Sequence, residues 1–293
     1  MVTLTPQPDP LTNAWRIYHD EPGGIWVDYF DGHWLVQTRD ASFPDHLKEA
    51  ARKAARSLYW KPRDKSAATK PEWVWGEKVT EKFNIRENGA VFRVDFSAGY
   101  SPGIFLDQRL NRQRVKRAIK PGDKFLNTFA YTGAFSVMAA LAGAQTTTLD
   151  LSASYLDWTW ENFRANDIDP GKHYGCKGDA FEWLRTFARQ GRMFQGIVLD
   201  PPTFSRGKKG RKTFHTDRDY AELVQLATRV INPGGWMLCC ANALQMKSWK
   251  FQEVVVRALD VAVNPVGEIR YFEMPPEFHG DNYLKTLWVD VGL

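Results

Sequence analysis

The sequence predicts a doubly wound α/β domain preceded by a small α+β domain. From Asp107 onward, helical patterns alternate with short apolar strand patterns, as is typical of a mostly parallel sheet covered by helices on both faces. Before that point, strand patterns are separated by turn signals and by a single helical pattern. We therefore assign residues 1–100 to a first domain, expected to help recognise the substrate, and residues 101–293 to a second.

The first domain is predicted from two strand pairs and one helix. Asp31-Gly32 separates two strand patterns and is a two-residue hairpin signal. Alanines and Leu58 share one face of the helical pattern, and lysines and arginines occupy the other. The expected elements are strands Trp26–Phe30 and Trp34–Thr38, helix Pro44–Tyr59, and strands Lys78–Ile85 and Ala90–Phe96.

The second domain is predicted from repeated strand–helix units and a different ending. The expected strands are Lys124–Asn127, Thr146–Asp150, Tyr174–Lys177, Gly196–Asp200 and Trp236–Ala241. The expected helices are Leu106–Ile119, Gly133–Ala142, Ala153–Asn166, Ala180–Arg189, Asp219–Val230 and Trp249–Leu259. The last two strands, Gly267–Glu273 and Tyr283–Val291, have no helix between them, so we expect them to pair antiparallel.

Composition narrows the class of protein. The net charge of +5 and pI of about 9.0 fit a polyanionic partner without requiring one. Apolar runs stay far below the ~20 residues of a membrane helix, and the N-terminus lacks a signal-peptide pattern, so we expect a cytoplasmic protein. The three cysteines and the scattered histidines predict neither a disulfide framework nor a metal site. Most of the 12 tryptophans are expected in cores and domain contacts, with one or two available for stacking on bases.

Four positions at the ends of successive predicted strands suggest a ligand site, because ligands bind at this edge of an open α/β sheet. Asn127–Gly133 leads into a helix, where a glycine permits close approach of a ligand. Asp150 can accept hydrogen bonds from ribose hydroxyls, and Asp179 follows Gly178 where an adenine would lie. Asn127 and Asp150 are each also explained as capping or turn residues. No G-x-G-x-x-G fingerprint is present, which disfavours a dinucleotide-dependent oxidoreductase.

The fourth position, Asp200-Pro201-Pro202, is the most specific of the set. Two prolines remove two backbone donors and fix φ, which leaves rigid carbonyls beside a carboxylate. Such a group of acceptors suits a planar nucleobase that carries N–H groups, and Phe204 is placed to stack on it. The alternative is a proline turn that simply ends the strand.

Taken together, these motifs resemble the S-adenosylmethionine (SAM)-dependent methyltransferases of large-subunit (23S) ribosomal RNA. The similarity is to the cytosine-5 enzyme and to the guanine-N7 half of the bifunctional K/L enzyme, over roughly residues 13–293. It is carried by Phe105–Arg109 with Asn111-Arg112, by Asn127–Gly133, by Asp150 and by Asp200–Phe204. The resemblance implies a seven-stranded sheet with a terminal antiparallel hairpin, SAM as cofactor, and an RNA base as substrate.

The resemblance also implies roles for individual residues. The residues implied to contact SAM are Asp107, Gln108, Arg109, Asn127, Tyr131, Gly133, Asp150 and Asp179, while Asp200 would face the target base. The cytosine-5 members carry an N-terminal RNA-binding PUA domain, and this chain begins about where that domain would end. They also use a cysteine nucleophile, because cytosine C5 is unreactive until a thiolate adds to C6. Cys240 lies at or next to that position; both Cys239 and Cys240 are otherwise explained as strand core.

The segment after Phe204 is strongly basic. Arg206–Lys212 has five cations in seven residues, including Lys208 and Lys209, and is expected either to hold substrate phosphates or to be a solvated loop. The favoured function is SAM-dependent methylation of a guanine or cytosine in structured RNA, as part of ribosomal RNA processing. The alternatives are a methyltransferase of a small molecule or protein, and a catalytically silent SAM-fold protein that binds RNA. The sequence predicts no oligomeric state.

Overall fold

The computed structural model describes residues 4–63, 70–98, 101–202, 204–205, 214–260, 266–278 and 283–292. The chain forms two compact units. The first contains residues 1–111 together with 274–281, and the second contains 112–273 together with 282–293. The boundary expected at residues 100–101 falls inside the first unit. The return of residues 274–281 to the first unit has no counterpart in the sequence patterns.

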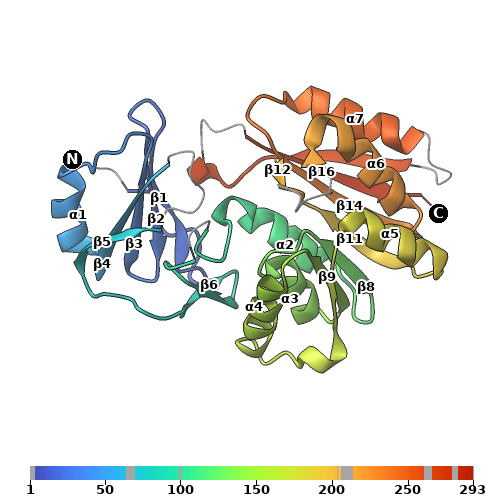
Figure 1. Ribbon diagram of the computed structural model, residues 1–293, viewed down its shortest axis with the longest axis horizontal. Coiled ribbons are helices and arrows are strands. Elements are labelled where there is room, and N and C mark those ends of the chain that lie inside the picture. Colours follow the sequence, from blue (N-terminus) through green and yellow to red (C-terminus); the bar gives the residue numbers. More distant parts are fainter. Residues whose placement is uncertain are drawn as a thin grey trace. The chain divides into compact units, whose positions relative to one another are not determined.

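The first unit is built on a five-stranded sheet with one helix (Figure 1). Its elements are β1 (Ala14–Asp20), β2 (Ile25–Phe30), β3 (His33–Thr38), α1 (His46–Ala54), β4 (Ser57–Pro62) and β5 (Glu72–Gly76). The strands are adjacent in chain order, and all pairs are antiparallel except β3 with β4, which α1 connects. A separate hairpin follows, formed by β6 (Phe83–Glu87) and β7 (Ala90–Val94).

Both hairpins expected in the first unit are confirmed. Asp31 and Gly32 both have positive φ, 46° and 93°, as a two-residue hairpin loop requires. The expected helix Pro44–Tyr59 is only partly correct. The helix ends at Ala54, and β4 begins at Ser57, where Leu58 and Tyr59 pair with β3. Strands β1, β4 and β5 were not anticipated.

The second unit contains a seven-stranded sheet in the order β10-β9-β8-β11-β14-β16-β15. The strands are β8 (Lys124–Thr128), β9 (Gln145–Asp150), β10 (Tyr174–Lys177), β11 (Phe194–Leu199), β14 (Ile231–Asn242), β15 (Val266–Phe272) and β16 (Leu284–Val291). The first five of these are parallel, while β16 is antiparallel to both β14 and β15. The predicted doubly wound sheet with a terminal antiparallel pair is therefore confirmed.

Helices cover both faces of this sheet (Figure 1). They are α2 (Arg109–Ala118), α3 (Ala134–Leu141), α4 (Ala153–Arg164), α5 (Ala180–Arg189), α6 (Thr216–Thr228) and α7 (Ser248–Asp260). One face packs against α5, α6 and α7 through buried side chains such as Phe187, Tyr220 and Phe251. Helices α3 and α4 contact β8 and β9. Because each strand is followed by a helix, the parallel strands all end at one edge, and this edge carries the predicted site. Within the described residues, no helix is long and apolar enough to cross a membrane.

Candidate active site

The loop after β8 contains three residues with left-handed backbone and begins at a cluster of buried polar side chains. Phe129, Tyr131 and Gly133 have φ of 53°, 50° and 75°. Beneath them, Asn127 Nδ2 donates to Ser136 Oγ at 3.0 Å, and Thr148 Oγ1 donates to the same oxygen at 2.7 Å. All three side chains are buried. The Asn127 side chain therefore links the end of β8, where the loop begins, to Ser136 of α3.

Gly133 has a packing reason for being glycine. A Cβ added there would lie 2.3 Å from Thr159 Cγ2 on α4, and the left-handed φ already disfavours any side chain. From the sequence alone, the expected reason for a glycine here is the close approach of a ligand. In the structure, the side chain of Thr159 occupies that space and accounts for the glycine without a ligand.

Asp150, at the end of β9, ties two loops of the site together. Its Oδ2 accepts from the Tyr131 backbone N–H at 2.8 Å, and its Oδ1 accepts from the Ser152 N–H at 2.9 Å. Burial raises the pKa of this carboxyl above its usual value, and the backbone hydrogen bonds oppose that shift. The contact with Tyr131 brings together two residues that the sequence predicts as cofactor-binding.

The aromatic side chains beside this contact form a small cluster. The Tyr131 ring centroid lies 4.6 Å from that of Tyr155 in an edge-on arrangement and 6.3 Å from that of Trp158, both on α4. Such edge contacts are favourable for aromatic pairs and fix the orientation of the tyrosine. Sequence analysis did not single out Tyr155, although its spacing of three from Trp158 places both on one helix face.

Asp179 is the N-cap of α5. Its Oδ1 accepts from the backbone N–H groups of Phe181 and Glu182 at 2.9 and 3.2 Å, which satisfies two of the free donors at the helix start. It follows β10, the strand next to β9, and so lies at the same edge of the sheet as Asp150. A half-buried acid at a helix N-terminus is compatible with a ligand contact but is explained structurally without one.

Asp200-Pro201-Pro202 directly follows β11, as predicted. The strand ends at Leu199, whose carbonyl accepts a hydrogen bond from the buried Tyr220 hydroxyl at 3.0 Å. Asp200 is half-buried, Pro201 is buried and Pro202 is exposed. Since β11 lies beside β8, the carboxylate of Asp200 belongs to the same sheet edge as the loop that carries Tyr131.

The two neighbouring cysteines lie inside the sheet. Cys239 and Cys240 are both fully buried on β14 and, being adjacent on a strand, face opposite sides of the sheet. Burial raises the pKa of Cys239 to about 12, which makes it unreactive as a nucleophile. Cys240 is paired across the sheet with Thr286 of β16. This placement favours the alternative in which both cysteines are core residues.

Asp107, Gln108 and Arg109 belong to the first unit and are all buried there. Arg109 Nη2 lies 2.8 Å from Glu277 Oε1, in the segment that returns to this unit. Among the described residues, Nε and Nη1 of Arg109 are buried without a hydrogen-bond partner. A buried guanidinium with two spare donors fits an anionic group of a ligand.

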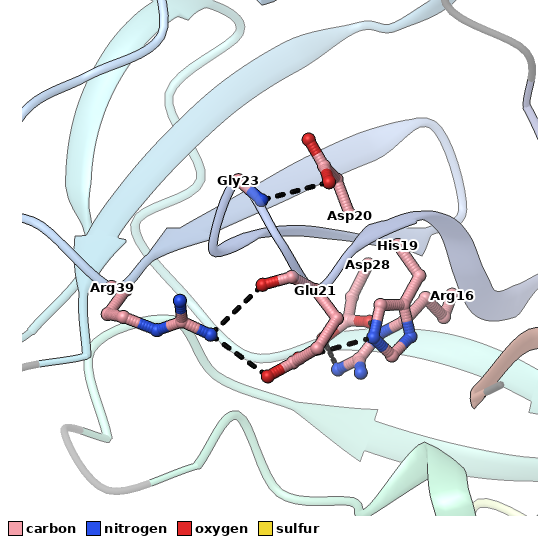
Figure 2. Close-up of polar contacts among 7 residues, drawn as sticks. All are labelled: Arg16, His19, Asp20, Glu21, Gly23, Asp28 and Arg39. Atoms are coloured by element: carbon pink, nitrogen blue, oxygen red, sulfur yellow. Dashed lines mark hydrogen bonds and ion pairs between the residues drawn. The ribbon is translucent and has the colours of Figure 1, made fainter. Parts of the chain in front are cut away.

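Two further ion pairs of the first unit, shown in Figure 2, involve residues that the sequence patterns did not indicate. Arg16 Nε lies 2.8 Å from Asp28 Oδ1, with both side chains buried. Arg39 Nη2 donates to the Glu21 carboxylate and backbone carbonyl, at 2.9 and 3.0 Å. Each cation is paired with an acid of its own unit, as Arg109 is with Glu277, but neither belongs to the predicted site, so we assign no anionic ligand to them.

Three predicted substrate residues cannot be placed. The side chains of Phe204, Lys208 and Lys209 lie outside those that the structure describes. Within the described part of the chain, no group of histidines, cysteines or acids is arranged to hold a metal ion.

Comparisons with known proteins identify the family of the chain. The family described as S-adenosylmethionine-dependent methyltransferase matches residues 43–285. The chain is 32% identical to a candidate ribosomal RNA large subunit methyltransferase, YwbD of Bacillus subtilis (strain 168), over 94% of this chain and 74% of that protein. It is 39% identical to ribosomal RNA large subunit methyltransferase K/L of Legionella pneumophila (strain Corby), over 58% of this chain but only 24% of that protein.

The fold comparison gives the same result. The crystal structure of SMU.776, a candidate methyltransferase complexed with SAH, superposes with a TM-score of 0.83 at 27% identity. The match covers 97% of this chain and 76% of that one. The resemblance drawn from the sequence motifs is therefore confirmed.

Proposed function

We propose that this chain, which belongs to the S-adenosylmethionine-dependent methyltransferase family, methylates a base of a structured RNA, with large-subunit ribosomal RNA as the first candidate. The observation that carries the proposal is the shared edge of β9, β8 and β11. At this edge Asp150 ends β9, the Tyr131 loop follows β8 and Asp200-Pro-Pro follows β11. Its relatives named above are described as ribosomal RNA methyltransferases, which supports an RNA substrate. A cytoplasmic location accompanies that substrate and remains a prediction.

The residues present fit the cofactor of this family. When bound, SAM supplies a methyl group on a positively charged sulfur. Asp150 and Asp179 are acceptors suited to ribose hydroxyls and an adenine amino group, and the loop at Tyr131 and Gly133 would line the same edge of the second unit. In the first unit, the spare donors of Arg109 suit a carboxylate, so Asp107, Gln108 and Arg109 remain predicted cofactor residues.

A nitrogen of guanine is the target that the chain's own residues support best. Asp200 would accept an N–H of the base and, with the fixed carbonyls at Pro201 and Pro202, hold the ring for in-line attack on the methyl group. The base nitrogen would supply its own electron pair, and Asp200, which accepts its N–H, would take the proton that this nitrogen loses, so no covalent bond to the enzyme would be needed. Cytosine C5 would require a thiolate, and the burial of Cys240 argues against that route.

The test is methyl transfer to RNA with identification of the product. The full chain is incubated with isotope-labelled SAM and unmodified, transcribed 23S RNA, and the digested nucleosides are identified by mass spectrometry. We expect labelled methylguanosine. Labelled 5-methylcytidine would make Cys240 the nucleophile and overturn the nitrogen mechanism. An absence of label in RNA, with SAM binding confirmed by calorimetry, would overturn the RNA proposal and favour a small-molecule or protein substrate, or a silent binder.

A further inference from the structure

Three large side chains are exposed beyond the carboxyl end of β14 and near the start of α7. Leu244 is 77% exposed, Trp249 is 67% exposed and Tyr271 is 40% exposed. Among the described large hydrophobic residues, Leu244 and Trp249 are the two most exposed. We call these three residues the Trp249 platform. Contiguous exposed apolar patches mark binding sites, and Trp249 and Tyr271 are linked through Ser248, the neighbour of Trp249 in the chain.

The Trp249 platform lies at the edge of the sheet that carries the predicted site. Strand β14 is the parallel neighbour of β11, with Leu199 opposite Cys239, so Asn242 at its end lies on the same edge as Asp200. Leu244 follows two residues later, and α7 begins at Ser248. The Tyr271 hydroxyl lies 3.2 Å from Ser248 Oγ, which links β15 to the start of α7.

The segment that carries Leu244 and Trp249 is positively charged. From Asn242 to Gln252 the sequence has two lysines, Lys247 and Lys250, and no acid. Both lysines are exposed, and Lys250 Nζ lies 6.0 Å from the centroid of the Trp249 ring. Lys250 also contacts Glu253 Oε2 at 2.8 Å, but that carboxylate is shared with Arg257. The segment therefore retains cations to meet a negatively charged partner.

We propose that the Trp249 platform stacks unpaired nucleotides that flank the target base, with Lys247 and Lys250 contacting their phosphates. Aromatic faces with adjacent cations are the combination that binds single-stranded nucleic acid without sequence preference. A protein partner fits less well, because charged residues, lysine among them, are depleted from the cores of protein interfaces. This inference rests on the proposed RNA substrate and adds where that substrate contacts the enzyme.

The test compares Trp249→Ala with Trp73→Ala, which removes the same side chain from a 46% exposed position in the first unit. The probe is a fluorescein-labelled 15-nucleotide oligouridine, with the dissociation constant measured by anisotropy in the full chain. Loss of one base-stacking contact is expected to raise the dissociation constant of Trp249→Ala about tenfold. Trp249→Phe should retain most of the affinity, and Trp73→Ala should match the wild type. Thermal unfolding checks that each variant is folded.

The two lysines are tested through the salt dependence of oligouridine binding. Neutralising one phosphate contact on a single strand lowers the slope of log affinity against log salt by about 0.7. We therefore expect Lys247→Gln and Lys250→Gln each to reduce the slope by about that amount. Wild-type affinity in Trp249→Ala would overturn the proposal, as would a change in oligomeric mass of that variant with unchanged oligouridine binding, which would identify a protein interface.

The platform and the proposed function can fail separately. If the wild type methylates 23S RNA but Trp249→Ala methylates it with unchanged KM and kcat, the platform is wrong and the function stands. If no RNA is methylated but oligouridine binding depends on Trp249, the platform stands and the catalytic proposal is wrong. A raised KM for RNA with unchanged SAM affinity supports both.

Discussion

Replacing Gly133 by alanine is expected to destabilise the protein and loosen the loop that carries Tyr131. The new Cβ would lie 2.3 Å from Thr159 Cγ2, 2.6 Å from its Oγ1 and 2.9 Å from its Cβ. Carbon atoms in contact normally lie ~3.5–4.0 Å apart, so at least one element must shift. We expect about 1–3 kcal/mol from overpacking and about 1–2 kcal/mol from the left-handed φ of 75°.

A double-mutant cycle separates these two contributions. Thr159→Ala removes Cγ2 and Oγ1, together with the hydrogen bond from Oγ1 to the Tyr155 carbonyl. In the Gly133→Ala background it should therefore cost less than in the wild type, with a coupling of about 1 kcal/mol or more. Urea unfolding measures each free energy of unfolding, and calorimetry measures SAM affinity, which we expect to fall in Gly133→Ala because the same loop donates to Asp150. Equal stability of Gly133→Ala and wild type would refute the reasoning, as would a cycle with no coupling.

Four further predictions concern the acids, the buried arginine and the cysteine. Burial raises the pKa of Asp150, so its carboxyl should add to the free energy of unfolding below its unfolded pKa and lose that contribution as pH rises through its folded pKa. Urea unfolding of the wild type and Asp150→Asn measures the contribution, and a difference that stays constant between pH 3 and 7 contradicts the prediction. Asp179→Ala should lose about 1 kcal/mol of stability as a lost N-cap, whereas Asp179→Asn keeps the single accepting oxygen and should lose little, so an equal loss in both variants would exclude capping. Arg109→Gln should lower the free energy of unfolding by about 3 kcal/mol at pH 7, because it leaves Glu277 buried without its ion-pair partner. The loss should be smaller at pH 5, because burial raises the pKa of Glu277 and protonation removes its charge. Denaturant unfolding at the two pH values tests this trend, and an equal loss at both would contradict it. Cys240→Ala should retain RNA methylation within about twofold if the target is a guanine nitrogen, since no thiolate takes part, and abolished turnover in a folded variant would reverse that assignment.

The sequence predicted the second unit well because its signals are local. Each parallel strand there is a short apolar run followed by an amphipathic helix, and the polar residues at strand ends stand out against that background. Asp150 and Asp200 were found in this way, and the structure places Asp150 at the last position of β9 and Asp200 directly after β11. The supporting residues were not found. Nothing in the chain marks Thr159 as the neighbour of Gly133, because that contact depends on how α4 packs on the loop.

The first unit was harder to predict because its pairing is partly non-local. The run of alanines before Ser57 extends a helical pattern, so β4 was absorbed into the helix. The aromatic residues Tyr59 and Trp60, which favour a strand, become decisive only once β3 offers Ser57–Pro62 a parallel partner. Strand β1 carried a usable signal that was missed: Trp15 and Ile17 alternate with Arg16, and the structure buries the first two in the core while Arg16 pairs with Asp28.

The connection between β15 and β16 shows a further limit of pattern reasoning. The two strands pair antiparallel, as predicted, and such a pair is most simply joined by a loop that stays beside its own sheet. Here the connecting residues 274–281 belong to the first unit, where Glu277 pairs with Arg109 and the Arg16 guanidinium lies 4.3 Å from the centre of the Phe278 ring. A glutamate and an aromatic after two prolines would pass for an ordinary surface turn. The burial of Glu277 and Phe278 shows that this turn is a structural part of the first unit. The contact is distant in sequence, because Arg109 and Glu277 are 168 positions apart.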